Sequence, residues 1–152
     1  MKVSLDIDEI YEETKVTIHC FEVDDSIKEI LDFLKRKKTE FLVGRDGEMQ
    51  HILKPDEIHY FHTEKEGVVA VTAAGSFSLK EKLYELEEML PATKFIRLSK
   101  SVIANLHELS RFEASFNGTL VVHFKSGAKE YVSRTYVSGI KEALQMNRRK
   151  NG

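Results

Sequence analysis

The sequence predicts a mainly β fold with minor helices (α+β overall), preceded by a short βα extension. Three observations lead to this fold class. Short runs of alternating apolar and polar residues, separated by turn residues, recur along the chain and dominate its C-terminal part. Three other segments carry apolar residues at helical spacing. The hydrophobic content of 41% and the charged content of 32% are typical of a folded chain rather than a disordered one.

The first 50 residues are expected to form the βα extension, which begins with a strand. Thr14–Phe21 alternates Val16, Ile18 and Cys20 with polar residues, as a half-buried strand does. Cys20 would then lie on the inward side, where we expect a buried, inert thiol rather than a redox sensor. A single cysteine forms no internal disulfide, which suits a reducing cytosol.

A helix and a strand pair should follow within the extension. Ser26 and Glu29 fit a capping box, in which the two side chains satisfy free amide donors at the start of a helix. Behind it, apolar residues repeat at helical spacing at Ile27, Ile30, Leu31 and Leu34. The basic run 35–38 suits the negative end of the helix dipole. Residues 41–53 are predicted to form a strand pair around the turn 44–47.

The second segment should open with two strands and a helix. Residues 57–61 and 68–72 are the predicted strands, and the charged loop 63–67 joins them. Ser78 and Glu81 form a second capping box. The helix expected to start there places four leucines on one face, at Leu79, Leu83, Leu86 and Leu90.

The rest of the second segment is predicted to be antiparallel β with one closing helix. Extended segments are expected at 95–105, 111–116, 119–124 and 129–133. Asn117-Gly118 is the strongest short hairpin signal, because a type I′ turn requires positive φ at both of its central positions. The closing helix is expected at about residues 137–146, followed by a basic tail at 148–152.

The charge is distributed unevenly along the chain. The formal net charge is −2, but residues 92–152 hold 11 Lys and Arg against four Asp and Glu, a net +7. Residues 1–91 therefore carry −9. Such an asymmetry indicates that the C-terminal part meets a polyanion, although a solvated basic face would give the same count.

Several motifs of the second segment resemble the LytTR DNA-binding domain family. In chain order these motifs are Ile58–Phe61, Leu83–Glu87, Phe95–Leu106 and Tyr131–Val137. The third motif combines an aromatic residue, Arg97, a serine-containing tripeptide, an apolar triplet and Asn105. The resemblance covers roughly residues 51–146, and the motifs occur in the family's order.

The resemblance implies an elongated domain of small antiparallel sheets that belongs to a bacterial transcription regulator. Such domains insert loops into successive major grooves, usually at paired direct repeats. We therefore expect a βα extension at 1–50, a LytTR-like domain at 51–147 and a basic tail at 148–152. Because a typical domain needs ~100–150 residues, the extension is too short for a receiver, and we expect no control by phosphorylation within this chain.

The resemblance also implies three places where the domain faces DNA. They are the loop after the opening strand, the turn after Arg97, and the segment before the closing helix. The expected DNA-facing residues are Lys65, Ser99, Lys100, Ser101, Ser133, Arg134, Thr135 and Tyr136. Arg97, Lys129 and Lys141 could add attraction that is independent of sequence.

The chemistry of these residues suits DNA recognition. Arg134 offers a planar fork for guanine O6 and N7, and Lys100 could serve the same edge or a phosphate. The hydroxyl groups could fix the register on phosphates. Arg134 could instead pair with Glu130 at the surface, and Lys65 has no preferred role because Glu64 and Glu66 flank it. Two alternatives concern single residues: Tyr136 could be a core-edge aromatic, and Asn105 is expected to bridge a turn.

No enzyme, metal or cofactor site is expected from this sequence. The histidines at 51, 59 and 62 have no Cys, Asp or Glu at the spacing of a metal-ligand set. No Ser/His/Asp or Cys/His arrangement is indicated either. No apolar stretch of ~18 residues and no signal peptide is present, so the protein is expected in the cytoplasm, without insertion into the membrane.

The function expected from sequence is sequence-specific binding to double-stranded DNA as a homodimer. The apolar face of the extension's helix could support dimerisation or receive a regulatory partner, such as a membrane protein encoded beside it. The alternative is a degenerate LytTR-like module that binds a partner regulator and no DNA, and the overall acidity favours it. A small-molecule sensor would need a pocket, which sequence does not reveal.

Overall fold

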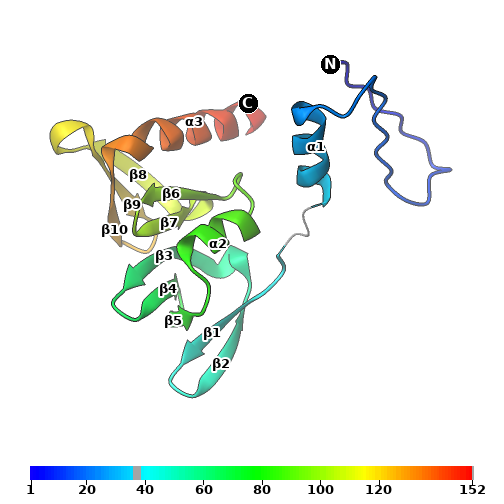
Figure 1. Ribbon diagram of the computed structural model, residues 1–152. Coiled ribbons are helices and arrows are strands. Elements are labelled where there is room, and N and C mark those ends of the chain that lie inside the picture. Colours follow the sequence, from blue (N-terminus) through cyan, green and yellow to red (C-terminus); the bar gives the residue numbers. More distant parts are fainter. Residues whose placement is uncertain (36–38, 152) are drawn as a thin grey trace. The chain divides into compact units, whose positions relative to one another are not determined.

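The computed structural model describes residues 1–35 and 39–151, which belong to two compact units divided between residues 37 and 38 (Figure 1). The first unit contains one helix, α1 (Asp25–Lys35). Its cap is Asp24, whose Oδ1 accepts a hydrogen bond from the Ile27 amide at 3.0 Å. The expected cap, Ser26, lies inside the helix, because Asp24 is also a good N-cap residue and takes that position first. Of the basic run, Lys35 ends α1 and 36–38 lie outside the described residues.

The predicted strand Thr14–Phe21 is wrong. Residues 14–20 have no regular structure, and Cys20 is exposed rather than buried. Alternation indicates a strand only where a second strand pairs with it and one face is covered. Within the described part of this unit neither condition holds, and the side chain of Phe21 is fully exposed.

The second unit is built on a seven-stranded antiparallel sheet. Its strands are β1 (Leu42–Asp46), β2 (Met49–Leu53), β3 (Ile58–Glu64), β4 (Gly67–Thr72), β5 (Gly75–Leu79), β6 (Phe95–Ser99) and β7 (Val102–Asn105). Their spatial order is β2-β1-β5-β4-β3-β7-β6. The hairpins expected at 41–53 and 57–72 are confirmed, and β1 pairs with β5 at Arg45 and Ser78. Short 3₁₀ turns at Pro55–Glu57 and Leu106–Glu108 lead into β3 and out of β7.

The helix between β5 and β6 begins later than the capping motif predicted. Ser78 pairs with Val69 in the sheet, and this extended backbone excludes it from a helix cap. The helix α2 (Leu83–Met89) starts after Lys82, whose amide donates to Glu85 Oε1 at 3.1 Å. Leu79 therefore belongs to β5.

A second, three-stranded sheet and a long helix complete this unit. The strands β8 (Leu109–Ala114), β9 (Leu120–Phe124) and β10 (Lys129–Val132) lie in the order β10-β9-β8. The turn at Asn117-Gly118 has positive φ at both residues, 54° and 76°, as predicted. The helix α3 (Arg134–Asn151) begins three residues before its expected start, because Ser133 occupies the capping position and its carbonyl accepts a hydrogen bond from the Tyr136 amide at 2.8 Å.

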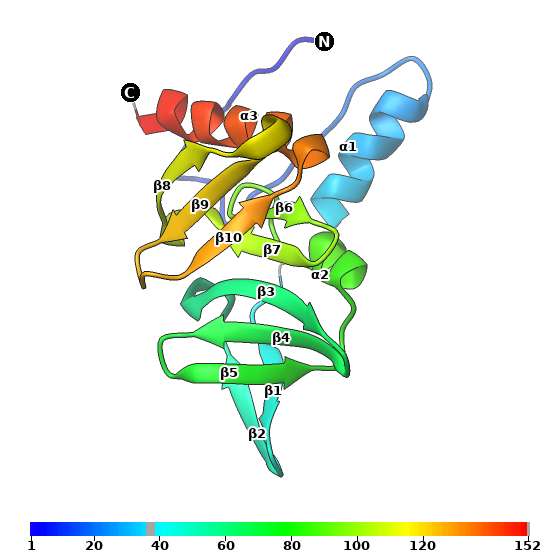
Figure 2. The ribbon, with the colours of Figure 1, turned by 90° about the vertical axis from the view of Figure 1, so that its left-hand side faces the viewer.

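Two hydrophobic cores meet at β6 and β7. The first joins the large sheet to α2 and includes Phe61 and Leu86, which are fully buried. The second joins the small sheet to α3 and includes Val122 and Ile140. Figure 2 shows α3 lying along the small sheet, while the β1–β2 hairpin extends from the other end of the unit. Because β7 is buried along its whole length, the strands that carry the turn between β6 and β7 are held from both sides.

Candidate nucleic-acid interface

Three parts of the second unit that are distant in sequence are joined by backbone hydrogen bonds. They are the β3–β4 turn with the end of β3 (residues 63–67), the β6–β7 turn with the end of β6 (residues 98–102) and the first turn of α3 (residues 133–136), and we call them the recognition strip. The Thr63 amide donates to the Ser101 carbonyl at 3.0 Å. The Ser133 amide donates to the Leu98 carbonyl at 2.9 Å. All three parts lie on the same side of the unit, at the right in Figure 2.

The β6–β7 turn occupies the middle of the recognition strip and follows an irregularity in β6. Arg97 pairs with Ile103 and Ser99 pairs with Val102, so one extra residue, Leu98, is accommodated between them. This shift is a β-bulge, which redirects the end of a strand. It leaves the Leu98 carbonyl for Ser133 and presents the side chains of Lys100 and Ser101 to solvent.

Arg97 is committed to the backbone of this turn. Its Nε donates to the Ser99 carbonyl at 2.6 Å, and one terminal nitrogen donates to the Lys100 carbonyl at 2.7 Å. The other terminal nitrogen forms an ion pair with Glu87 of α2. The side chain is 17% exposed. Its guanidinium therefore has little capacity left for a phosphate.

The start of α3 presents donors at its tip. Arg134 and Thr135 are exposed, and Ser133 is half-buried. The first backbone amides of a helix have no partner within the helix, and its dipole favours an anion there. Tyr136 packs against the second core, as the core-edge alternative expected. This end of α3 therefore combines the features of a phosphate site with one exposed arginine.

Arg134 does not form the ion pair with Glu130 that the sequence allowed. Among the described residues, neither Glu130 nor any other carboxylate forms an ion pair with its guanidinium. Its aliphatic part lies beside Gly118, where an added Cβ would come 3.3 Å from Arg134 Cδ. Lys141 is exposed seven residues later on α3, and this spacing places the two side chains on the same helix face.

The β3–β4 turn contributes less positive charge than the other two parts. Lys65 is exposed at its tip, but Glu64 and Glu66 beside it are exposed as well. The Oε1 atom of Glu64 also lies 3.8 Å from the Nε2 atom of His62. Any contact of Lys65 with a polyanion must therefore overcome two neighbouring negative charges.

A half-buried group of three side chains lies behind the strip and was not expected from sequence. Burial raises the pKa of the Glu130 carboxyl, and the nearby His62 opposes this shift. Burial also raises the pKa of Tyr60, and Glu130 adds to the effect. The Tyr60 ring lies 5.8 Å from that of His62 and 4.7 Å from that of Phe124, between centroids. Only the approach of the two sheets brings Glu130 of β10 near β3, so no local signal could have revealed the group.

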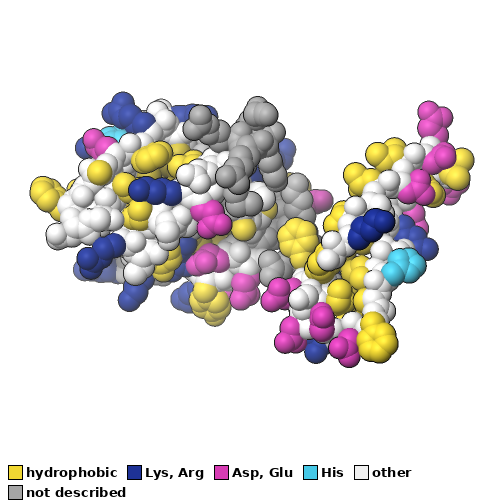
Figure 3. Space-filling view, turned by 90° about the horizontal axis from the view of Figure 1, so that it is seen from above, with side chains coloured by type: hydrophobic (Ala, Val, Ile, Leu, Met, Phe, Trp, Pro, Cys, Tyr) yellow, Lys and Arg dark blue, Asp and Glu magenta, His cyan; other side chains and the backbone are white. Residues whose placement is uncertain are grey.

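Lys and Arg side chains gather at one end of the second unit. Figure 3 shows several of them around its left-hand end in the view from above, with Asp and Glu among them and nearer the middle. On the small sheet, His123 Nε2 lies 3.0 Å from Glu113 Oε1 and forms a hydrogen bond with it. This hydrogen bond lowers the pKa of the Glu113 carboxyl. Lys129 pairs with His123 in the ladder of that sheet and is exposed.

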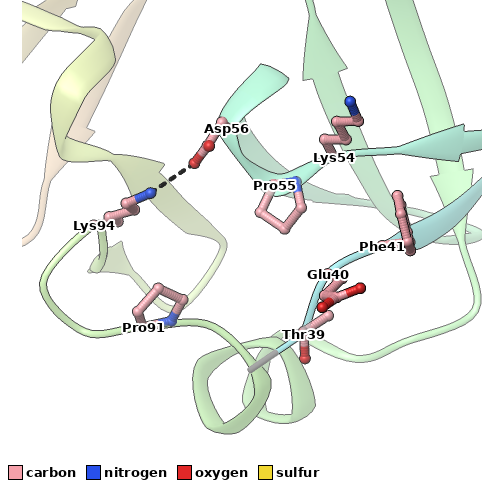
Figure 4. Close-up of a pocket in the computed structure, with 8 residues that line it drawn as sticks. All are labelled: Thr39, Glu40, Phe41, Lys54, Pro55, Asp56, Pro91 and Lys94. Carbon is pink, nitrogen blue, oxygen red and sulfur yellow. Dashed lines mark hydrogen bonds and ion pairs between the residues drawn. The ribbon is translucent and has the colours of Figure 1, made fainter. Parts of the chain in front are cut away.

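A pocket of about 300 Å³ lies at the other ends of the strands that carry the strip (Figure 4). It is bordered by the residues that precede β3 and β6, where Lys94 Nζ lies 2.8 Å from Asp56 Oδ1. Asn105 bridges the neighbouring turn, as expected: it donates to the Ile58 carbonyl at 2.9 Å and accepts from the His107 amide at 3.0 Å. The pocket is therefore separate from the recognition strip.

In the part of the chain that the structure describes, no group of three or more His, Cys, Asp and Glu side chains is placed to hold a metal ion. None of the helices in that part combines the length and the apolar character that crossing a membrane requires.

Comparison with known proteins gives consistent results. The family model for the LytTr DNA-binding domain matches residues 48–145. An HTH-type transcriptional regulator of Staphylococcus aureus strain NCTC 8325 is 33% identical over 147 residues, which cover 96% of this chain and 99% of the relative. The corresponding regulator of strain MRSA252 is 32% identical over the same length. A LytTr DNA-binding domain from Bacillus cereus has a similar fold, with a TM-score of 0.67 and 19% identity, over 70% of this chain and 97% of that one.

Proposed function

The chain belongs to the LytTR DNA-binding domain family, a family of DNA-binding regulators and not of enzymes, and from this premise we propose that it is a sequence-specific transcription regulator. The recognition strip is the proposed contact surface. The observation that carries the proposal is the pair of backbone hydrogen bonds, Thr63 to Ser101 and Ser133 to Leu98, that holds the three parts of the strip together. Although the relatives are named as HTH-type regulators, the strip consists of two turns and a helix end.

We assign base recognition to the exposed cations at the middle and the upper end of the strip. The Arg134 fork suits guanine O6 and N7, and the Lys100 ammonium suits the same acceptors. Both side chains are exposed and lack an ion pair among the described residues. These two residues should therefore determine which sequences the protein prefers.

Phosphate contacts are assigned to the residues around these two. The hydroxyl and amide groups at the start of α3 and in the β6–β7 turn suit phosphate oxygens, which fix the register on a duplex. The residues proposed for this role are Ser99, Ser101, Ser133, Thr135, Lys65 and Lys141. Tyr136 is half-buried against the core, so its proposed role is to support the start of α3.

We further propose that the protein acts in the cytoplasm as a homodimer that reads two direct repeats in successive major grooves. The helix α1 supports this assembly, because its apolar side chains at 27, 30, 31 and 34 form one face and none of them is fully buried. Linking two DNA-binding domains raises the local concentration of the second at its repeat. A regulatory membrane partner could compete for the same face of α1.

The rival function is a protein-interaction module that binds no DNA. The acidity of residues 1–91 and the glutamates beside Lys65 favour it. It is opposed by Arg134, which forms no ion pair with Glu130 or with any other described carboxylate, since the rival would be favoured by an Arg134 held against Glu130. The geometry thus supports the DNA-binding function over the rival.

The decisive experiment is a titration of the purified protein against fluorescent duplexes from its own promoter region and against random duplexes. Specific binding requires a site at least ~10³-fold tighter than random DNA. With about five phosphates neutralised, log K should fall against log salt with a slope of about −4 to −5. Folded protein that binds no duplex at low salt would support the interaction module. A steep salt slope without sequence preference would contradict the assigned base contacts.

A further inference from the structure

We infer that Arg97 is a positioning residue, which fixes the β6–β7 turn so that Lys100 meets a base edge, and that it is not a phosphate ligand. This inference rests on the proposed function, because it assigns a role within the recognition strip. It also changes the role that sequence suggested for Arg97, which was general attraction to the phosphate backbone.

The guanidinium of Arg97 already bonds to three partners within the protein. All three of its nitrogens are occupied, by the carbonyls of Ser99 and Lys100 and by the carboxylate of Glu87. An arginine side chain has five N–H donors in a rigid fork, and three of them are used here, including the single N–H of Nε. A phosphate would therefore have to displace a partner before it could form a paired contact through Nε.

Without Arg97, the β6–β7 turn would lose two of the hydrogen bonds that fix its backbone. The bulge shifts the register of the ladder between Arg97 and Ser99, and the pair Ser99–Val102 is the last one, so the β6–β7 ladder does not pair Lys100 and Ser101. Within the turn, the Ser101 amide bonds to Ser99 Oγ at 3.1 Å. Arg97 adds two bonds to successive carbonyls, and two bonds from one rigid group define the orientation of the peptide units that flank Lys100.

The positive charge of Arg97 is balanced within the protein. Glu87 of α2 pairs with Arg97, so the two side chains together carry no net charge toward a distant polyanion. The pair instead connects α2 and the first core to the middle of the recognition strip. A lysine at position 97 would preserve the charge but has one point-like ammonium, which cannot reproduce a fork across two carbonyls and a carboxylate.

The test uses the full chain and four variants: Arg97→Lys, Arg97→Gln, Lys100→Ala, and the double variant with Arg97→Lys and Lys100→Ala. Arg45→Lys is the matched control, since Arg45 is exposed on β1, outside the strip. We expect Arg97→Lys to lose about 10-fold or more of the preference for promoter over random DNA, the range that one specific base contact provides. The salt slope and the binding to random DNA should stay unchanged, as they should in the control.

The double variant separates positioning from an independent contact. If Arg97 acts through Lys100, the double variant should discriminate no less than Lys100→Ala alone, because neighbouring residues of one unit are not additive. Additive losses would overturn the inference. It would equally be overturned if Arg97→Lys retained full discrimination while Arg97→Gln reduced the salt slope by about 0.9, the signature of one lost phosphate contact.

A measurement without DNA keeps this inference distinct from the proposed function. In the free protein, the Thr63 and Ser101 amides report the turn, since they donate to Ser101 and Ser99. Arg97→Lys should accelerate hydrogen exchange at these two amides and leave the amides of β4 and β9 unchanged. Unchanged exchange at both would overturn the positioning role, whether or not the wild-type protein binds DNA. Wild-type protein that binds no DNA but shows the exchange effect would refute only the proposed function.

Discussion

Arg134 lies against Gly118, so the residue proposed to contact a base rests on the turn of the β8–β9 hairpin, at the same end of the small sheet. A Cβ added at position 118 would come 3.3 Å from Arg134 Cδ and 3.6 Å from its Cγ. The two residues are 16 positions apart in sequence, and the positive φ of Gly118, 76°, shapes the turn that brings them together. The hairpin signal at Asn117-Gly118 therefore has a consequence for the recognition strip.

The variant Gly118→Ala tests this contact. A residue with a Cβ at positive φ should destabilise the protein by about 1–3 kcal/mol, as measured by urea unfolding. The added Cβ should also displace Arg134 and reduce the preference for promoter DNA. Gly127→Ala is the control, because Gly127 has φ of 95° and no neighbouring atom within 4 Å of the added Cβ. If both variants lose discrimination equally, the contact with Arg134 is not the cause.

Alternating patterns predicted the structure of this chain better than short capping motifs did. The strands and hairpins of the second unit were predictable because alternation reports a sheet with one buried face. Both predicted capping boxes were wrong, because the motif is short and other interactions were stronger. Asp24 caps α1 in place of Ser26. Ser78 pairs with Val69 in the sheet and so does not cap a helix. The strand at 14–21 failed because the described unit supplies no partner strand.

The candidate site shows the same division. The family motifs located all three parts of the recognition strip, because each motif lies at a turn or at a helix start. They did not predict the role of Arg97, which depends on the carbonyls that the bulge turns toward it. They also did not predict the approach of Glu130 to His62, which requires both sheets to be in place.

Arg134 and Lys141 should contribute to binding in different ways. Arg134→Ala should lose about 10-fold or more of the preference for promoter DNA, because a bidentate base contact provides discrimination. Lys141→Ala should weaken binding to promoter and random DNA alike and reduce the salt slope by about 0.9, as expected for one phosphate contact. Fluorescence anisotropy at three salt concentrations measures both quantities. The assignment would be reversed if Lys141→Ala changed the sequence preference and Arg134→Ala changed only the slope.

Glu130 should make stability depend on pH in a defined direction. Its pKa in the folded protein is raised by burial, so the folded state binds this proton more tightly than the unfolded state does. The stability of the wild-type protein relative to Glu130→Gln should therefore rise as the pH falls from above the raised pKa toward the ordinary value of a glutamate, about 4.3. Urea unfolding of both proteins across this range measures the difference. A relative stability that falls over the same range would show that the attraction of His62 dominates over burial.

Gly44 should be required by packing rather than by backbone conformation. An added Cβ would come 2.6 Å from Phe77 Cβ and 2.7 Å from Leu53 Cδ1, which are in the first core. Gly44→Ala should therefore cost about 1–3 kcal/mol through overpacking, measured by urea unfolding. Gly139→Ala provides the contrast, since Gly139 lies in α3 with no atom within 4 Å of the added Cβ. That variant should gain about 0.5–1 kcal/mol from the better helix propensity of alanine, and a loss there would show that α3 has a contact not seen in the monomer.

The proposed dimer depends on the apolar face of α1. Replacing Ile30 by glutamate places a charge in the centre of that face, where burial against a second copy would be costly. Light scattering after size exclusion at tens of micromolar should give twice the 17.5 kDa mass of one chain for the wild-type protein, and the mass of one chain for Ile30→Glu.

The control is Lys28→Glu, on the exposed side of the same helix, which makes a larger change in charge and should leave the dimer intact. A wild-type protein that remains a single chain with and without promoter DNA would refute the dimer, and α1 would then be a candidate surface for the regulatory partner. If instead both variants dissociate, the charge of α1 rather than its apolar face controls assembly, because Lys28→Glu leaves every apolar side chain in place.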